Sequence, residues 1–245
     1  MTTTLNFVDS EKGGTGKSWF ARTLHHLFVK RNILFSGIDS DTANPTYHHI
    51  YPDTYQIPFS IRDKDCDLAD EVFELARQSH LIVNLPAQAN AGLSQWLMDK
   101  DVTTMAPQHH ILLKKWWVSD GEEDSIQLFV NSVNNYGKSI QHIFVRNAGR
   151  CTEWEYCDSH QELQKTIAAH NIKVMDFPKL GDMRRIRINA ERLDFQKALV
   201  HPSFGILGQA QVALYLKTAE TVLEQAGAFE GINPVEKQKP NSKEH

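Results

Sequence analysis

Residues 11–18 read EKGGTGKS, and this stretch decides the fold. Its three glycines let the backbone turn several N–H groups toward one point, where they can hold an anion. An apolar run at residues 5–8 precedes the loop, and apolar residues recur at three- and four-residue steps over residues 18–29. A strand, a glycine loop and a helix therefore follow one another, which is the order typical of a phosphate-binding loop.

Strands and helices alternate along most of the remaining chain. We expect further strands at residues 33–38, 81–86, 110–118, 140–145 and 172–175, and helices at residues 67–79, 91–100, 125–133, 153–170, 182–199 and 205–227. This alternation predicts an α/β fold with a doubly wound, mostly parallel sheet and helices on both faces. Ligands of such folds bind beyond the carboxyl ends of the strands. The polar residues that mark these ends are Asp9, Asp39, Asn84, Ser119 and Asn147.

The composition is that of an ordinary globular protein. The chain has 245 residues, 41% of them hydrophobic and 23% charged, so one large domain accounts for it. We expect a single nucleotide-binding domain at residues 1–230 and a polar, disordered tail at residues 231–245. The sequence has no apolar run of membrane-spanning length and no secretory signal, and its three cysteines are an odd number. We therefore expect a cytoplasmic protein with reduced thiols and no attachment to a membrane.

The loop predicts a nucleotide site with a magnesium ion. Lys17 is placed to reach the β- and γ-phosphates of a nucleotide, and the hydroxyl of Ser18 is placed to ligate Mg²⁺. The helix that begins near this lysine adds the positive end of its dipole. The alternative is a glycine-rich turn that arises by chance. Because the motif stands between a strand and a helix, as in a phosphate-binding loop, we expect ATP or ADP, with Mg²⁺, to bind here.

A second lysine distinguishes this loop from an ordinary one. Residues 12–18, KGGTGKS, resemble the deviant Walker A motif of the ParA/MinD family, a branch of the P-loop ATPases that act as nucleotide-dependent dimers. In that family the first lysine reaches across the dimer interface to the ATP phosphates of the other subunit, as an arginine finger does in trans. The resemblance implies this role for Lys12, and therefore an ATP-dependent homodimer. The alternative interpretation is that Lys12 is a solvated surface charge.

The segment after the second predicted strand, residues 39–41, also resembles the family, which has a D-x-D motif at this point. The resemblance implies that Asp41 orients the attacking water and that Asp39 lies closer to Mg²⁺, held through water. The alternative is a simple turn followed by a helix cap. The expected catalytic residues are Lys12, Lys17 and Asp41.

Residues 81–87 occupy the place of the family's Walker B strand, where an aspartate is expected, but Asn84 stands at that position. Asparagine still offers a carbonyl oxygen to Mg²⁺-bound water, but it carries no charge. We therefore expect weaker metal binding and slow turnover, with Asp39 as a compensating carboxylate. Residues 86–88 are expected to form the loop that senses the γ-phosphate. The expected metal site is Ser18, Asp39 and Asn84.

Two later segments resemble the parts of the family that bind the base. Residues 143–147 resemble a strand that ends in an asparagine, and the amide of Asn147 can donate to adenine N7 and accept from the exocyclic amine. An asparagine after a strand is also common in ordinary turns. Residues 177–180 resemble the loop that packs on the base. The full set expected to bind the nucleotide is Lys12, Gly13, Gly14, Thr15, Gly16, Lys17, Ser18, Trp19, Asn147 and Pro178.

Three arginines of a late helix are candidates for contact with non-specific duplex DNA, which several members of the family bind. They are Arg184, Arg185 and Arg187, and the first and last of them share one helix face. A solvated face, or ion pairs with Glu191 or Asp194, are equally good interpretations. The net charge of −4 gives no general attraction to nucleic acid.

The run KKWW at residues 114–117 falls on a predicted strand, so its two tryptophans point to opposite faces and at least one belongs to the core. Contact with a partner is the alternative for this run. Neighbouring histidines, as at residues 25 and 26, point in different directions and are interpreted as structural rather than metal-binding. The C-terminal residues are too polar to form the amphipathic membrane helix of MinD-like proteins.

The leading hypothesis is an ATP-binding and hydrolysing dimeric switch of the ParA/MinD type that is stimulated by a partner protein. Its cargo would be DNA, as in plasmid partition, or a DNA-transfer complex. The alternative is an ATP-responsive adaptor with little or no hydrolysis, an accessory protein in conjugative transfer, which Asn84 permits. Biosynthetic ligases of the same superfamily generally lack the first lysine. Reductases similar to the nitrogenase iron protein need cysteines more widely separated than Cys151 and Cys157.

Overall fold

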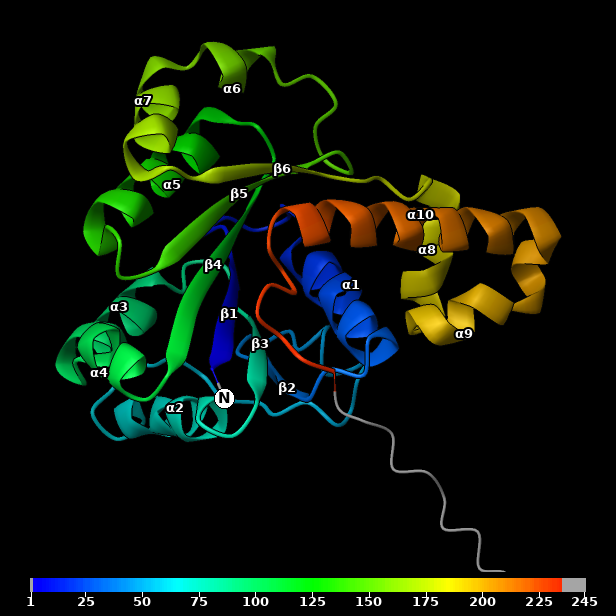
Figure 1. Cartoon of the computed structure of the whole chain (residues 1–245). Coiled ribbons are helices and arrows are strands. Elements are labelled where there is room, and N and C mark those ends of the chain that lie inside the picture. Colours follow the sequence, from blue (N-terminus) through cyan, green and yellow to red (C-terminus); the bar gives the residue numbers. More distant parts are fainter. Residues whose placement is uncertain (1, 235–245) are drawn as a thin grey trace, which may run out of the picture.

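A parallel sheet forms the centre of the structure. The computed structural model describes residues 2–234, and its six strands lie in the order β2-β3-β1-β4-β5-β6, each parallel to its neighbours (Figure 1). The strands are β1 (Thr3–Asp9), β2 (Phe35–Asp39), β3 (His80–Asn84), β4 (Ile111–Ser119), β5 (Gln141–Asn147) and β6 (Lys173–Phe177). The chain places β2 and β3 on one side of β1 and the later strands on the other side. The carboxyl end of β1 is therefore the point where a ligand crevice is expected.

Helices cover both faces of the sheet. The first face carries α1 (Lys17–Lys30), α8 (Asp182–Ala190), α9 (Phe195–Val200) and α10 (Gly205–Gln225). The second face carries α2 (Asp70–Ala76), α3 (Asn90–Asp99), α4 (Val102–Gln108), α5 (Glu123–Tyr136), α6 (Glu155–Ser159) and α7 (Gln161–His170). Two short 3-10 helices, η1 (Cys66–Ala69) and η2 (Pro202–Phe204), complete the structure. The predicted α/β fold, with a parallel sheet between two layers of helices, is confirmed.

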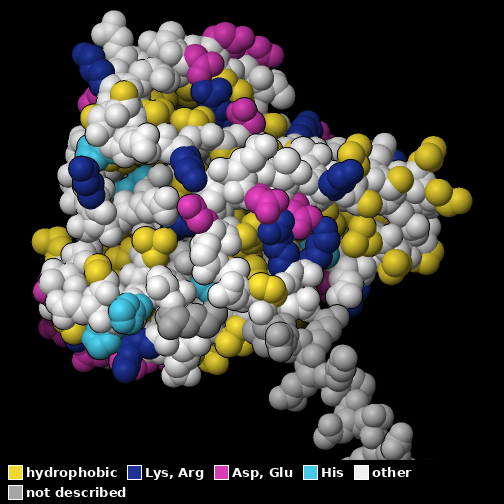
Figure 2. Space-filling model, in the orientation of Figure 1, with side chains coloured by type: hydrophobic (Ala, Val, Ile, Leu, Met, Phe, Trp, Pro, Cys, Tyr) yellow, Lys and Arg dark blue, Asp and Glu magenta, His cyan; other side chains and the backbone are white. Residues whose placement is uncertain are grey.

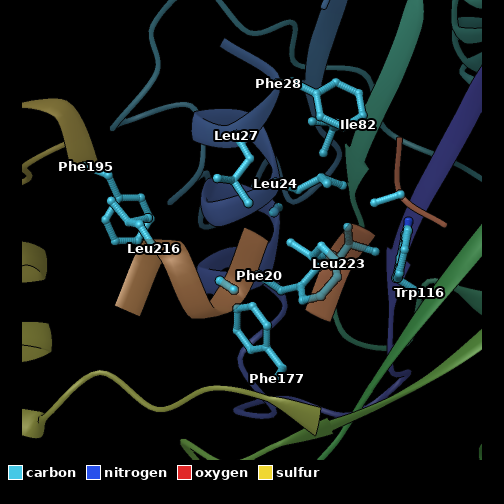
Figure 3. Packing of buried hydrophobic residues seen from close by; sticks show 14 of the residues in the cluster. Phe20, Leu24, Leu27, Phe28, Ile82, Trp116, Phe177, Phe195, Leu216 and Leu223 are labelled. Atoms are coloured by element: carbon cyan, nitrogen blue, oxygen red, sulfur yellow. The ribbon is translucent and has the colours of Figure 1, made fainter. Parts of the chain in front are cut away.

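The apolar stripe of α1 packs between the sheet and α10. Figure 3 shows side chains from this stripe packed near Ile82 of β3, Trp116 of β4 and Leu223 of α10. Each large apolar side chain buried in this way stabilises the fold by about 1.5–3 kcal/mol, and the helix that follows the glycine loop is therefore held firmly. The fully buried residues of the stripe recur at three- and four-residue steps and are Phe20, Leu24, Leu27 and Phe28.

The strand β4 carries the KKWW run, and all four of these side chains are buried. Trp116 lies on the first face, 5.5 Å from the ring of Phe20, and Trp117 lies on the second face, 5.9 Å from the ring of Phe129. The prediction of a core tryptophan is therefore confirmed for both. The buried lysines were not predicted. Lys114 Nζ donates to the carbonyl oxygen of residue 227 at 2.7 Å, and burial lowers the pKa of Lys114 to about 8.

Several expected helices are divided. Residues 153–170 form α6 and α7, because His160 between them has an extended backbone and caps α7 by accepting a hydrogen bond from Leu163 N at 3.2 Å. Residues 182–199 form α8 and α9, and Asp194 caps α9 by accepting from Lys197 N at 2.7 Å. Residues 67–79 form η1 and the short α2. In the first two cases a polar side chain accepts a hydrogen bond from the backbone and begins a new helix, and the apolar spacing does not reveal such a cap.

Two further boundaries differ from the expectation. The helix α4 was not predicted, and the left-handed backbone of Asp101 (φ 49°) separates it from α3. The strand β2 begins at Phe35, so residues 33 and 34 lie before it. None of the helices in the described part of the chain combines the length and the apolar character needed to cross a bilayer. The predicted disordered tail falls mostly on residues 235–245, which lie outside the described residues.

The space-filling view shows a cluster of apolar side chains at one end of the molecule (Figure 2). There α8, α9 and the first turns of α10 project beyond the edge of the sheet (Figure 1). The exposed apolar residues of these elements are Met183, Ile186, Val200, Ile206, Leu207 and Leu214. We refer to these six residues as the apolar tip.

Candidate nucleotide-binding site

Two glycines give the loop between β1 and α1 its shape. Gly14 and Gly16 have left-handed backbones, with φ of 84° and 103°, which side chains rarely permit. A Cβ atom at Gly16 would lie 2.4 Å from Nδ2 of Asn147, so this position also lacks room for a side chain. The glycine spacing seen in the sequence is therefore a requirement of both backbone conformation and close packing.

The loop opens into a cavity of about 650 Å³ at the carboxyl ends of the strands. Most of the predicted site residues line it, and they come from segments far apart in the sequence. These residues are Gly13, Gly14, Gly16, Lys17, Ser18, Trp19, Asp41, Asn147 and Pro178. Lys12, Thr15, Asp39 and Asn84 do not line the cavity. All five polar residues expected at strand ends are the last residues of β1 to β5.

Lys17 lies over the loop. Its side chain is 8% exposed, and Nζ donates to Ser10 Oγ at 3.0 Å and to the carbonyl oxygen of Lys12 at 2.7 Å. Burial lowers the pKa of Lys17, while the nearby carboxylates of Asp9, Glu11 and Asp41 oppose this shift. The ammonium group is therefore held beside the loop by neutral oxygens, which an anion can replace.

A buried ion pair fixes the start of the loop. Asp9 Oδ2 lies 2.9 Å from Lys115 Nζ, and both side chains are almost fully buried. Asp9 Oδ1 accepts hydrogen bonds from the backbone N–H groups of Ser10 at 2.7 Å and Glu11 at 3.1 Å. Burial alone would raise the pKa of Asp9, but the Lys115 ammonium and these N–H groups hold it below its usual value. The orientation of the first loop residues therefore depends on a lysine of β4.

Ser18, Asn84 and Asp39 form a chain of contacts beside the cavity. Asn84 Nδ2 donates to Asp39 Oδ1 at 2.9 Å and to Ser18 Oγ at 3.3 Å. A carboxylate only accepts hydrogen bonds, so the amide nitrogen must face Asp39. Asn84 Oδ1 is buried and has no hydrogen-bond partner among the described residues. The residues therefore fit a Mg²⁺ site in part: a hydroxyl and an unpartnered amide oxygen are available, and both are neutral.

The carboxylate of Asp39 is occupied by protein donors. Oδ1 accepts from Asn84 and from Asp41 N at 3.4 Å, and Oδ2 accepts from Tyr47 N at 2.9 Å and His48 N at 3.0 Å. Burial raises the pKa of Asp39, and these hydrogen bonds oppose the shift. A role at Mg²⁺, which stays a prediction, requires Asp39 to exchange one of these donors. Within residues 2–234 no group of three or more acidic, histidine or cysteine side chains is arranged to hold a metal by itself.

Asp41 lies at the rim of the same cavity. Its Oδ1 accepts a hydrogen bond from Asn44 N at 3.1 Å, which makes a turn over residues 41–44. No helix follows in this segment, so the alternative interpretation is right about the turn and wrong about the helix cap. Asp41 is half-buried and lines the same cavity as the loop glycines and Lys17, so its carboxylate can orient a water molecule there.

Asn147 ties the end of β5 to the loop. Nδ2 donates to the carbonyl oxygen of Thr15 at 2.6 Å, and Oδ1 accepts from Gly149 N at 3.0 Å. The amide keeps one more proton and one more lone pair, so base recognition by Asn147 stays a prediction that these contacts permit. Trp19 turns its indole away from the loop and donates from Nε1 to Tyr215 Oη at 2.8 Å. Its side chain forms a wall of the cavity rather than a phosphate ligand.

The second lysine of the motif points away from the cavity. Lys12 Nζ lies 3.1 Å from Asp120 Oδ2 and 2.8 Å from Asp124 Oδ1, on the loop after β4 and the first turn of α5. In this structure Lys12 therefore forms a surface ion pair outside the cavity, and its role in nucleotide binding stays a prediction. The two aspartates were not predicted to matter.

The three arginines proposed for DNA have different surroundings. Arg187 lies 3.6 Å from Glu191 Oε1, which is the ion pair weighed as the alternative. Arg185 pairs with Asp182 at 3.3 Å and lines the cavity. Arg184 is half-buried. Exposed residues of the apolar tip, Met183 and Ile186, alternate with them along α8. The three do not form one continuous basic face, and their role in DNA binding stays a prediction.

The arrangement of strands and helices matches solved structures at low sequence identity. The chain is similar to a nucleotide-binding protein from Archaeoglobus fulgidus in complex with ADP, with a TM-score of 0.51 and 15% identity over 76% of this chain and 85% of that chain. It is also similar to the MinC:MinD cell division protein complex of Aquifex aeolicus, with a TM-score of 0.52 and 13% identity over 89% of this chain and 96% of that chain. The chain therefore shares the fold of these two proteins. No protein-family model and no curated protein matches the sequence.

We expect Lys115→Met to destabilise the fold by about 3–5 kcal/mol, because it leaves the Asp9 carboxylate buried without a partner. Urea denaturation of the variant and the wild type measures the loss. Lys114→Met is the matched control, since the neighbouring lysine is also buried but bonds to a neutral carbonyl oxygen. Equal losses in the two variants would contradict the importance of the ion pair.

The stability of the protein should depend on pH through the titration of Glu11, which precedes Lys12 in the loop. Burial and the Asp9 carboxylate raise the pKa of Glu11 to about 7, against the opposing charges of Lys115 and Lys17. The folded protein therefore holds this proton more tightly than the unfolded chain does. The contribution of Glu11 to stability is present at pH values below the ordinary value of 4.5 and is lost as the pH rises through 7.

Glu11→Gln mimics the protonated group, so the variant should lose less stability than the wild type between about pH 5 and pH 8. Thermal unfolding at both pH values measures the difference. Glu162→Gln, at an exposed position of α7, is the control and should behave as the wild type does. An unchanged pH dependence in Glu11→Gln would show that Glu11 does not titrate in this range.

Proposed function

We propose that the protein is an ATP-dependent switch of the ParA/MinD type, which binds ATP in this cavity and hydrolyses it as a homodimer. The observation that carries the proposal is the glycine loop, in which Gly14 and Gly16 turn the backbone and Lys17 lies over it beside Ser18. The ADP complex of the structurally similar archaeal protein supports a nucleotide as the ligand. The base would lie toward Asn147 and Pro178, which line the same cavity.

The chemistry proposed for the cavity is positional and electrostatic. Lys17 exchanges the Ser10 and Lys12 oxygens for phosphate oxygens, and the loop N–H groups and the start of α1 stabilise the negative charge. Asp41 orients the attacking water from the opposite rim of the cavity. Ser18 Oγ and Asn84 Oδ1 would hold Mg²⁺, and the bound ion would neutralise part of the phosphate charge. Because these two protein ligands are neutral, we propose slow turnover that a partner protein stimulates.

Dimerisation is proposed from the position of Lys12. In the single subunit its ammonium group is paired with Asp120 and Asp124, and Lys12 does not line the nucleotide cavity. An ammonium group on the outer side of the loop can reach the phosphates of a second subunit that faces it. The two aspartates then hold Lys12 until this second subunit arrives.

The cargo is proposed to be DNA, as in plasmid partition, or a DNA-transfer complex. The arginines of α8 support DNA weakly, because Arg187 and Arg185 already have acidic neighbours. The apolar tip supports the partner protein, since exposed apolar side chains of this number commonly mark an interaction surface. Binding of non-specific duplex DNA, with ATP and with ADP at two salt concentrations, separates a DNA-bound switch from an adaptor that binds protein.

Substitution of the two loop lysines tests the proposed function. Lys17→Ala should weaken ADP and ATP binding by more than about tenfold, because it removes a charge-assisted contact to the phosphates. Lys12→Ala should still bind ADP but should fail to form an ATP-dependent dimer. Calorimetry measures the affinity, and light scattering with ATP and Mg²⁺ measures the mass.

The control for Lys12 is Lys100→Ala, because Lys100 also pairs with two aspartates but lies far from the loop in the sequence and does not line the cavity. It should dimerise as the wild type does. A normal ATP-dependent dimer in Lys12→Ala would remove this lysine from the interface and leave it a surface charge.

Asn84→Asp tests the metal site. The new carboxylate would lie beside Asp39, whose Oδ1 is 2.9 Å from Asn84 Nδ2, so two like charges would meet in a buried place. We expect the variant to be less stable than the wild type without metal, and to recover stability as Mg²⁺ is added with ADP. Thermal unfolding against Mg²⁺ concentration measures this, and equal Mg²⁺ responses in both proteins would show that residue 84 does not face the metal.

A further inference from the structure

The cavity extends past the loop to a group of basic side chains that have no part in the nucleotide chemistry proposed above. Arg22 of α1, Arg185 of α8 and Arg192, just after α8, line this outer end together with Asn189. Arg22 stands five residues after Lys17 on the same helix, which places it about 7.5 Å farther along the helix axis. The outer end is therefore separate from the position that Lys17 can serve.

Arg22 is an arginine buried without a matching charge. It is 5% exposed, and its guanidinium group donates to two neutral oxygens, Asn189 Oδ1 at 2.7 Å and the Leu193 carbonyl at 2.9 Å. Its Nε has no hydrogen-bond partner among the described residues. The ring of Trp19 lies 5.0 Å from the guanidinium carbon. A buried charge of this kind is costly unless an anion compensates it.

The other two arginines line the same cavity in different surroundings. Arg185 Nε is buried without a hydrogen-bond partner in the described part of the chain, although the other end of the guanidinium group lies 3.3 Å from Asp182. Arg192 has a left-handed backbone with φ of 50°, at the position after a helix where glycine is favoured, yet it carries a long basic side chain to the cavity. Lys179 and Arg150 line the same cavity, whereas Asp41 is its only lining carboxylate among the described residues.

We propose that the outer end of the cavity, formed by Arg22, Arg185 and Arg192, binds a phosphate group in addition to those held at the loop. Planar guanidinium groups match the oxygens of a phosphate and can bind it with two hydrogen bonds each. The phosphate comes either from the ribose of the bound nucleotide, as a 2′- or 3′-phosphate, or from free inorganic phosphate. This inference rests on the proposed function, since the nucleotide at the loop defines the first of these sources.

Calorimetry at constant salt tests the first source by comparing ADP with ADP that carries an extra phosphate on the ribose 2′ or 3′ oxygen. The wild type should bind one of the two analogues at least about tenfold more tightly than ADP. Arg22→Gln and Arg192→Gly should bring this ratio close to one. Arg192→Gly also relieves the left-handed backbone, so loss of the ratio in this variant cannot be attributed to failure to fold.

The matched control is Arg187→Gln. Arg187 lies on the same helix as Arg185 but contacts Ser203 O and Glu191 and does not line the cavity. This variant should keep the ratio of the wild type. Equal loss of the ratio in Arg187→Gln and Arg192→Gly would indicate a general effect of charge and would overturn the proposed subsite.

Inorganic phosphate tests the second source. Added to protein saturated with ADP, it should bind to saturation in the wild type and in Arg187→Gln but not in Arg192→Gly. If ADP binds and neither the analogues nor phosphate show a dependence on Arg22 and Arg192, the inference is wrong while the proposed function stands. If ADP does not bind, the proposed function fails. The inference is then tested by titrating inorganic phosphate into the nucleotide-free wild type, Arg22→Gln, Arg192→Gly and Arg187→Gln, and binding that does not depend on Arg22 and Arg192 would overturn it.

Discussion

The ion pair between Asp9 and Lys115 is the interaction on which the candidate site depends. It joins the end of β1 to the middle of the sheet, and it does so where neither charge has access to water. The same carboxylate receives the first two N–H groups of the loop, so the direction in which the loop leaves the sheet is set by this one side chain. A salt bridge in such a place contributes less to net stability than to a defined geometry, and here that geometry is the opening of an anion site.

Much of the fold follows from local sequence patterns. The apolar run at residues 5–8, the glycines and the apolar spacing of residues 18–29 led to β1, the loop and α1. The polar residues at strand ends marked the edge of the sheet where the cavity lies, although only Asn147 among them lines it. Local patterns were less successful where one hydrogen bond decides the boundary, as at His160 between α6 and α7. Helix period and strand alternation describe faces, whereas a cap depends on one side chain and its backbone.

The features that the sequence did not reveal are contacts between distant charged residues. Lys115 sits in an apolar strand, and nothing near it in the sequence indicates that its partner is Asp9. Arg22 interrupts the pattern of α1, and its acceptors lie on and after α8. Lys12 was expected at an interface or in solvent, and its neighbours Asp120 and Asp124 follow β4. A charge at a buried position is a signal that a partner exists, but only the tertiary structure identifies the partner.

Asp39 organises the other side of the cavity in a comparable way. One carboxylate receives backbone donors from Asp41, Tyr47 and His48, and the amide of Asn84 completes the set. A second carboxylate at the end of β3 would repel Asp39 unless a cation lay between them. Asn84 therefore allows the residues around Asp39 to keep this arrangement without a metal ion. The same neutral side chain gives a metal ion less negative charge to bind than an aspartate would.

Trp19 has a practical consequence for work on this protein. Among the five tryptophans of the chain, it is the one that lines the cavity, and its indole donates to Tyr215 Oη and lies against Arg22. Trp116 and Trp117 are fully enclosed by the two core layers. Changes in intrinsic fluorescence on addition of a ligand would therefore come chiefly from the cavity wall, so that the chain carries its own optical reporter, without a dye or a label.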